Sequence, residues 1–142
     1  MTIPPMSHGP TPRTLSDFAG RWRLERQIVH DDGTVARFTG TANWTPEDDR
    51  LRCVEQGEMR IGDGPAMAGQ RIYLWDADLR VYFDDGRFFH TVPPTGGETG
   101  HWCDPDQYDG SYDFSDWPAF TVTWAVRGPR KAYQMTSHYK PA

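Results

Sequence analysis

The sequence predicts an all-β protein, an antiparallel up-and-down β-barrel of about ten strands with one short helical turn near its N-terminus. Three observations predict this class. Apolar and polar residues alternate along most of the chain, which is the period of a half-buried strand. Turn sequences rich in Gly, Pro and Asp interrupt the alternation roughly every 8 to 14 residues. An open sheet of so many strands would expose two long edges, and closing it into a barrel removes both.

The composition indicates one domain with many aromatic residues. The 142 residues include six Trp, six Tyr and seven Phe, and aromatic side chains favour strands and line ligand pockets. We expect residues 15–142 to form a single barrel domain. Residues 1–14 are rich in Pro and are expected to form a flexible arm.

Charge and hydropathy exclude some classes of partner. The net charge of −5 argues against a nucleic acid or an anionic membrane surface as partner. No apolar run approaches the roughly 18 residues that span a bilayer, and the first residues lack the apolar core of a signal peptide. We therefore expect a cytoplasmic protein in which Cys53 and Cys103 are reduced thiols. A homodimer is left open.

The first half of the chain reads as one helical turn followed by five strands. Ser16 is the expected N-cap of the helical turn. Alternating segments follow near residues 20–29, 34–44, 50–59, 70–75 and 79–83. In the first of them, Trp22 and Arg26 share one face, and in the third Cys53 and Glu55 do.

A hairpin turn is predicted in the middle of the chain. The Asp85-Gly86 pair suits a two-residue turn of type I′. This register sets Val81 opposite His90 and puts Phe88 and His90 together on the inner face, where His90 is the polar exception.

Four further strands are predicted near residues 98–103, 108–114, 119–126 and 130–139. The first of these puts His101 and Cys103 on one face. A short turn around residues 128–129 would set Lys131 across from Val126 and Tyr133 across from Trp124, so that Lys131 faces the interior.

Two resemblances support a barrel. The string FAGRW, residues 18–22, resembles the Gly-x-Trp opening of lipocalins and their calycin relatives. That resemblance implies a short helical turn leading into the first strand. It also implies that Trp22 packs at the closed end against an Arg from the last strand, for which Arg130 or Lys131 is the candidate.

The second resemblance covers about residues 15 to 139. The strings FAGRWRLER, RIYLW, DGRFFH, HWCDPDQY and GPRKAYQMTSHY, in that order, resemble the uncharacterised bacterial family called domain of unknown function 6314. The resemblance implies a calycin-like barrel. It supplies no activity and no catalytic residues, and the chain departs from a standard eight-strand secreted lipocalin.

Polar side chains gather on the inner face of the predicted barrel. Each unsatisfied polar group in a dry core would cost roughly 1–3 kcal/mol, so we expect a cavity rather than a packed interior. The expected ligand is a small organic molecule with an apolar or aromatic body and an anionic group, held by Arg26, Lys131 and Arg71. The phase of residues 70–75 is left open because Ile72 and Leu74 compete for the core. The predicted ligand-binding residues are Arg26, Glu55, Arg71, Tyr73, Trp75, Phe88, His90, His101, Cys103, Tyr112, Trp124, Lys131 and Tyr133.

Other functions use the same residues. An isomerase or lyase would use His90, His101 or Lys131 as its acid-base group, and burial would lower the pKa of Lys131. Haem could be held through His90, His101 or His138, but the expected interior is too polar. His90, His101 and Cys103 lack the spacing of a zinc site, so we expect neither metal nor cofactor.

Two interpretations without a ligand are also open. The barrel could be a packed interaction module without a ligand. Arg26 and Glu55 could form a purely structural ion pair.

Overall fold

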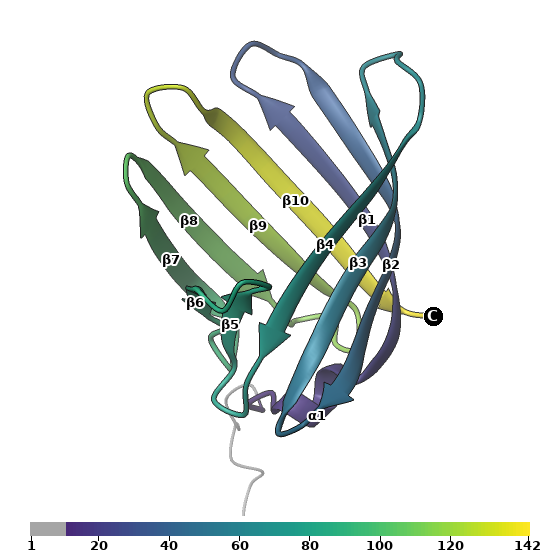
Figure 1. The fold of residues 1–142 in the computed structure, drawn as a ribbon, viewed down its shortest axis with the longest axis vertical. Helices are drawn as coiled ribbons and strands as arrows, with labels where there is room; N and C mark the ends of the chain where they lie inside the picture. The colour runs from purple at the N-terminus through teal and green to yellow at the C-terminus, as the bar shows by residue number, and fades with distance from the viewer. Residues whose placement is uncertain (1–10) are drawn as a thin grey trace, which may run out of the picture.

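The described residues, 11–142 of a computed structural model, form one ten-stranded antiparallel sheet preceded by a four-residue helix (Figure 1). The predicted all-β class and strand number are confirmed. The elements are α1 (Leu15–Phe18), β1 (Gly20–His30), β2 (Val35–Glu47), β3 (Arg50–Ile61), β4 (Met67–Trp75), β5 (Arg80–Phe83), β6 (Phe88–Thr91), β7 (Gly97–Cys103), β8 (Asp106–Asp113), β9 (Phe120–Arg127) and β10 (Ala132–Pro141).

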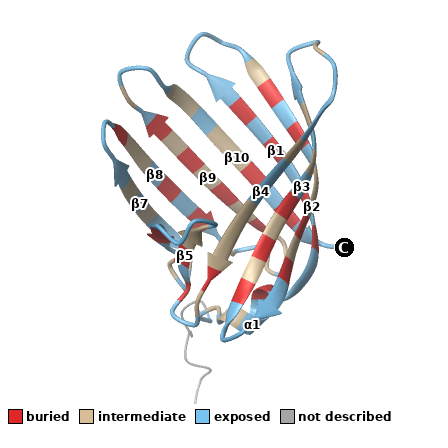
Figure 2. Ribbon diagram, in the orientation of Figure 1, coloured by how far each residue is buried: buried red, intermediate tan, exposed pale blue. Residues whose placement is uncertain are grey.

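The sheet curls into a nearly closed barrel. Its strand order is β6-β5-β4-β3-β2-β1-β10-β9-β8-β7, so the first and last strands of the chain pair with each other and the two ends of the sheet are β6 and β7. The Thr99 hydroxyl on β7 donates to the Thr91 carbonyl on β6 at 2.8 Å across this seam. Buried and exposed residues alternate along the longer strands, as expected for a wall with one face inward (Figure 2).

One end of the barrel is closed by aromatic packing around α1. Phe18 is fully buried, and the Trp22 indole N–H donates to its carbonyl at 2.9 Å. The Trp22 ring also packs edge-on against Trp44 and Phe120. The short helix leading into β1 and the packing of Trp22 at the closed end agree with what the Gly-x-Trp resemblance implies. The packed rings form the floor of the barrel interior.

The expected Arg130 or Lys131 partner of Trp22 is wrong. Both residues lie in the β9–β10 turn, while Trp22 pairs with Pro141 at the other end of β10. Arg13 contributes a cation at the closed end, where its guanidinium lies 4.5 Å from the ring centre of Trp117.

The N-terminal arm is described only from residue 11, so the expected flexibility of residues 1–14 lies mostly outside the described residues. The Arg13 N–H donates to the Pro94 carbonyl at 2.7 Å. The N-cap of α1 is Thr14 rather than Ser16, and the Thr14 N–H donates to Asp17 Oδ2 at 2.8 Å. This contact satisfies one of the free backbone donors at the helix start.

Two glycines allow a close approach in the barrel wall. Gly40 on β2 pairs directly with Gly57 on β3. A Cβ atom at Gly40 would collide with the Gln56 carbonyl, and one at Gly57 with the Thr39 carbonyl. The missing side chains let the two strands approach closely at this point of the wall.

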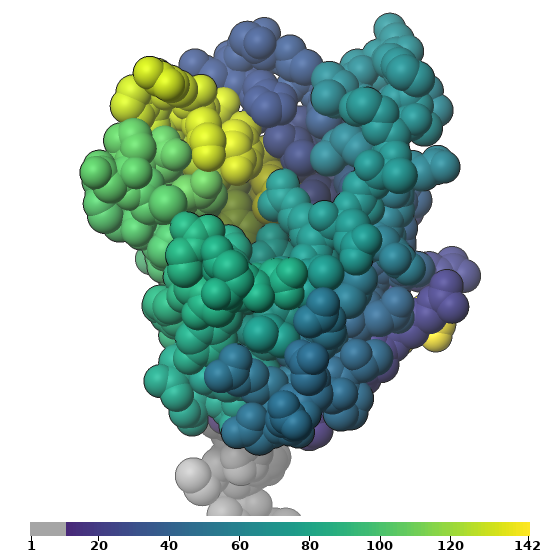
Figure 3. Space-filling view, in the orientation of Figure 1, coloured from purple at the N-terminus to yellow at the C-terminus, as the bar shows by residue number. Residues whose placement is uncertain are grey.

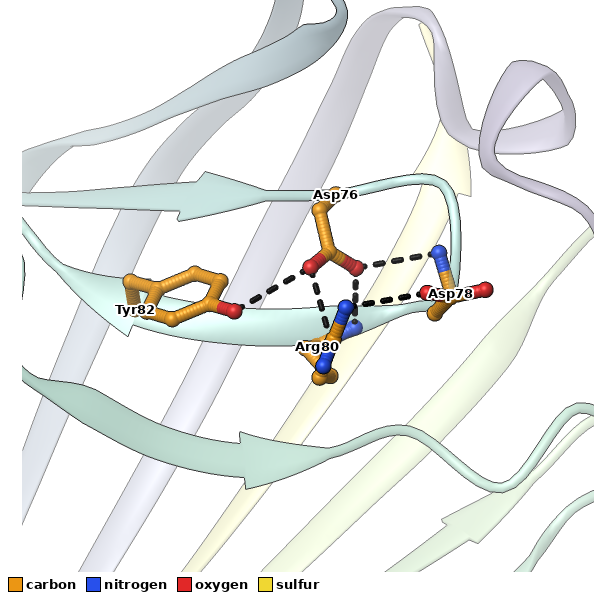
Figure 4. Close-up of polar contacts among 4 residues, drawn as sticks. All are labelled: Asp76, Asp78, Arg80 and Tyr82. Carbon is orange, nitrogen blue, oxygen red and sulfur yellow. Dashed lines mark hydrogen bonds and ion pairs between the residues drawn. The ribbon is translucent and has the colours of Figure 1, made fainter.

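The β4–β5 turn is held by one carboxylate (Figure 4). Asp76 accepts hydrogen bonds from the backbone N–H groups of Asp78 and Arg80, from Arg80 Nε and from the Tyr82 hydroxyl, at 2.9–3.1 Å. Leu79 adopts φ 60° in this turn although it has a side chain. The carboxylate thus offsets a strained backbone.

Within residues 11–142, no helix has the length and apolar character needed to cross a membrane.

Candidate functional site: a polar and aromatic cavity

The barrel encloses a cavity that opens away from α1. The centres of water molecules can occupy about 70 Å³ of it, which is several times the space that one water needs. Figure 3 shows the molecule hollowed between the β1–β2, β3–β4 and β9–β10 hairpins. Nine of the predicted residues line the cavity: Arg26, Glu55, Arg71, Tyr73, Trp75, His90, Tyr112, Trp124 and Tyr133.

The open phase of residues 70–75 is resolved by the pairing of β3 with β4. Glu55 lies directly opposite Arg71, and Cys53 lies opposite Tyr73. Directly paired residues of antiparallel strands share a face, so Arg71 and Tyr73 turn inward with Glu55.

An ion pair lies inside the cavity wall. Arg26 on β1 and Glu55 on β3 are 8% and 3% exposed, and Arg26 Nη2 lies 3.0 Å from Glu55 Oε1 and 3.1 Å from Oε2. Arg26 Nε donates to the Ser137 hydroxyl at 2.7 Å, and the Tyr139 hydroxyl donates to Glu55 Oε2 at 2.6 Å. Burial lowers the pKa of Arg26, but Tyr139 and Glu55 outweigh burial and raise it above its usual value. The pair is charged and held from three strands.

Three buried polar atoms on cavity-lining residues have no hydrogen-bond partner among the described residues. They are Trp44 Nε1, Glu55 Oε1 and His90 Nδ1. Glu55 Oε1 is near Arg26 Nη2, but that nitrogen already donates to Oε2 and the second contact is poorly directed. Buried polar atoms are normally satisfied, so these three mark where a polar guest would gain most.

The cavity carries a net positive charge. The charged residues that line it are Arg26, Arg71 and Glu55, and Glu55 is already paired with Arg26. No carboxylate within residues 11–142 forms an ion pair with Arg71, which is exposed. Tyr73, Tyr112 and Tyr139 remain neutral because burial raises the pKa of each phenol.

His90 is a neutral, hydrogen-bonded imidazole. Its Nε2 lies 2.8 Å from the Tyr112 hydroxyl. Burial, with a smaller contribution from His101, lowers the pKa of His90 to about 3. Near neutral pH it can therefore donate or accept a hydrogen bond according to its tautomer, but it is a weak base.

The predicted inward position of Phe88 is wrong. Phe88 is 47% exposed, and its neighbours Phe89 and His90 are both buried. A three-residue turn shifts the pairing of β5 with β6 by one residue from the predicted register near the hairpin tip. A bulge between Val81 and Tyr82 restores the predicted register further along the strands. Two consecutive residues therefore face inward, and Phe89 takes the position in the cavity that Phe88 was expected to hold.

The predicted inward positions of His101 and Cys103 are wrong in part. His101 packs against Phe83 and Phe89 at the seam, with ring centres 6.1 and 5.4 Å apart, but it does not line the cavity. Cys103 is exposed at the end of β7, which is an edge strand of the sheet. Cys53 is buried, and both thiols are free. No metal-binding group of three His, Cys, Asp or Glu occurs within residues 11–142.

The predicted inward position of Lys131 is wrong as well. Tyr133 pairs with Val126, two residues away from the expected Trp124, so Lys131 falls in the turn. There it is half exposed and its Nζ lies 3.5 Å from Asp106 Oδ2. The nearby Tyr108 and Asp106 raise the pKa of Lys131, the reverse of the expected direction. A slip of two residues keeps every side chain on its face, which is why Tyr133 still lines the cavity.

Several lining residues were not among the predicted binding residues. They include Trp44, Tyr108, Ser137 and Tyr139. The alternation that places Tyr133 inward also places Ser137 and Tyr139 inward, because all three have the same parity on β10. That signal was available in the sequence.

The fold and the interior define a class, a nearly closed up-and-down barrel of ten antiparallel strands with a polar and aromatic cavity. The model of DUF6314, a family of unknown function, matches residues 18–141, and the chain belongs to that family. A search of curated proteins gives no match. Among solved structures, the S-type phycobiliprotein lyase CPES from Guillardia theta is similar, with a TM-score of 0.55 and 9% identity over 88% of this chain and 87% of that chain. At that identity the likeness shows the fold alone.

Proposed function

We propose that the barrel binds a small organic anion with an aromatic or apolar body inside the cavity. The observation that carries this is the uncompensated charge of Arg71 beside an already paired Glu55. A carboxylate beside Arg71 would neutralise the cavity and accept charge-assisted hydrogen bonds. The aromatic walls would cover the rest of the molecule.

The size of the cavity selects small ligands. About 70 Å³ for water centres suits a compound of one or two rings, and a haem is far larger. His90 is also hydrogen-bonded to Tyr112, and His138 contacts Thr121 on the outside of the sheet. These contacts weigh against the haem alternative.

A second candidate function is an isomerase or lyase that uses the same cavity. A strongly lowered pKa at a buried histidine is a feature of active sites. The phycobiliprotein lyase with a similar barrel is an analogy of fold only. A pKa of about 3 makes His90 a poor proton acceptor at neutral pH, so we favour binding over proton transfer.

We also propose that the protein is cytoplasmic, because a reducing compartment keeps an exposed thiol such as that of Cys103 free.

The test uses benzoate, a minimal aromatic anion, titrated calorimetrically into the wild-type protein and two matched variants. Arg71→Met removes the unpaired cation of the cavity, and we expect it to weaken binding about tenfold or more. Arg37→Met removes an exposed cation that does not line the cavity and should leave affinity within about twofold. Equal effects of both variants, or no binding to the wild type, would overturn the proposal.

A further inference from the structure

We propose that the ligand presents the edge of a cyclic amide, an N–H beside a C=O, to Glu55 and Arg26 deep in the barrel. This inference rests on the proposed function and specifies the chemical class of the ligand. It is carried by a buried acceptor on Glu55 and an unused donor on Arg26, two side chains that are in direct contact.

The acceptor is Glu55 Oε1. Both hydrogen bonds that Glu55 receives, from Arg26 Nη2 and from the Tyr139 hydroxyl, go to Oε2. The buried Oε1 receives none within residues 11–142. A buried carboxylate oxygen with a free lone pair strongly prefers a donor over an apolar neighbour.

The donor is Arg26 Nη1. The other guanidinium nitrogens are used, Nε by Ser137 and Nη2 by Glu55 and Tyr139. Nη1 donates no hydrogen bond within residues 11–142, and it is not among the fully buried unpaired atoms, so it is open to a guest. Because Arg26 Nη2 touches both oxygens of Glu55, the free Nη1 and the free Oε1 belong to groups in direct contact.

The charges of the two groups select a neutral, two-sided partner. A carboxylate would suit Arg26 but meet the negative Oε1, and an ammonium would suit Glu55 but meet the guanidinium. An amide held cis in a ring donates to Oε1 and accepts from Nη1 through parallel hydrogen bonds without adding charge.

The walls favour a flat ring over a flexible chain. Phe89 lies nearly parallel to Phe83 and to Trp124, with ring centres 4.7 and 5.0 Å apart and interplanar angles of 14° and 22°. Phe89 and Trp124 both line the cavity. A planar heterocycle would pack against the edges and the outer faces of this stack. Arg71 lies directly opposite Glu55, so a carboxylate on the same small ring can reach it.

The experiment compares a probe with three analogues, the last of them 4-hydroxybenzoate, on the wild-type protein by calorimetry. The probe is 6-oxo-1,6-dihydropyridine-3-carboxylate, which carries the amide edge and the anion. Its N-methyl derivative keeps the anion and the carbonyl but lacks the donor, and benzoate lacks the whole edge. We expect the probe to bind at least tenfold more tightly than either, since sites built for hydrogen bonding reject analogues that leave a buried group unpaired.

The outcomes separate this inference from the proposed function. If benzoate binds in an Arg71-dependent manner and the probe gains less than tenfold, the proposed function stands and the amide edge is wrong. A 4-hydroxybenzoate that binds as tightly as the probe would replace the amide with a hydroxyl and overturn the inference as well. If none of the compounds binds, both proposals fall.

Discussion

Replacing Arg26 by Met tests whether the ion pair organises the barrel interior. Arg26 is 8% exposed and makes hydrogen bonds to Ser137, Glu55 and Tyr139. After the replacement, Glu55 at 3% exposure keeps only the Tyr139 hydroxyl as a donor. Leaving one buried charge without its partner typically costs about 3–5 kcal/mol. We expect that loss in the free energy of unfolding.

The measurement is urea unfolding at pH 7, followed by tryptophan fluorescence. With a urea dependence of about 1–3 kcal/mol per molar, the Arg26→Met midpoint should fall by about 1–3 M. Arg23→Met, on the exposed face of the same strand, should move it little. The double variant Arg26→Met, Glu55→Leu removes both charges and should be more stable than Arg26→Met alone, because an apolar pair avoids the desolvation of the ions.

The double variant also provides the refutation. A loss below about 1 kcal/mol for Arg26→Met would mean that water reaches Glu55 freely. If the double variant loses as much unfolding free energy as Arg26→Met and Glu55→Leu lose together, the two charges do not interact. Either result would remove the basis for treating these groups as one buried unit.

Three further predictions concern other parts of the barrel. Because the pKa of His90 is lowered to about 3 while the unfolded value is near 6.5, the unfolded chain binds a proton that the native state excludes. Acidification from pH 7 to pH 5 should cost the wild type about 2 kcal/mol more than His90→Gln in parallel urea titrations. Phe89→Ala should lower stability by about 3–5 kcal/mol and Phe88→Ala by less than about 1 kcal/mol in thermal unfolding; comparable losses would contradict the bulge. Asp76→Asn should cost about 1–3 kcal/mol at pH 7. Hydrogen bonds outweigh burial and lower the pKa of Asp76, so its contribution is lost as the pH falls below about 4 and the variant should then approach the wild type.

The strands and their inward faces were predictable because they depend on local alternation. Trp22 and Arg26 on β1, or Val122 and Trp124 on β9, follow the period of two without interruption. An ion pair between Arg26 and Glu55 is one interpretation of the sequence, and in the structure the two side chains are 3.0 Å apart. A barrel of this size leaves few places for two inward charges other than beside each other.

The details that decide the site were not predictable in this way. The Asp85-Gly86 pair indicates a two-residue turn, but the Phe83 N–H donates to the Arg87 carbonyl and closes a three-residue turn in which Gly86 adopts φ 89°. The bulge then restores the expected pairing of Val81 with His90. Local sequence cannot specify two compensating shifts, because packing inside the barrel determines where the extra residue is absorbed.

The two-residue difference between the predicted and the observed pairing of β9 with β10 changes the charge of the cavity. With Lys131 inside, the cavity would hold three cations against Glu55, and an anion would have several partners. The observed register puts Lys131 outside beside Asp106 at 3.5 Å and leaves Arg71 as the cavity cation without a carboxylate partner in residues 11–142. Arg71, which has no carboxylate partner, and the Arg26–Glu55 ion pair on the neighbouring strands give the cavity two polar positions of different character. A ligand with only one kind of polar group cannot satisfy both positions, so recognition should depend on the arrangement of the polar groups on the ligand as well as on its charge.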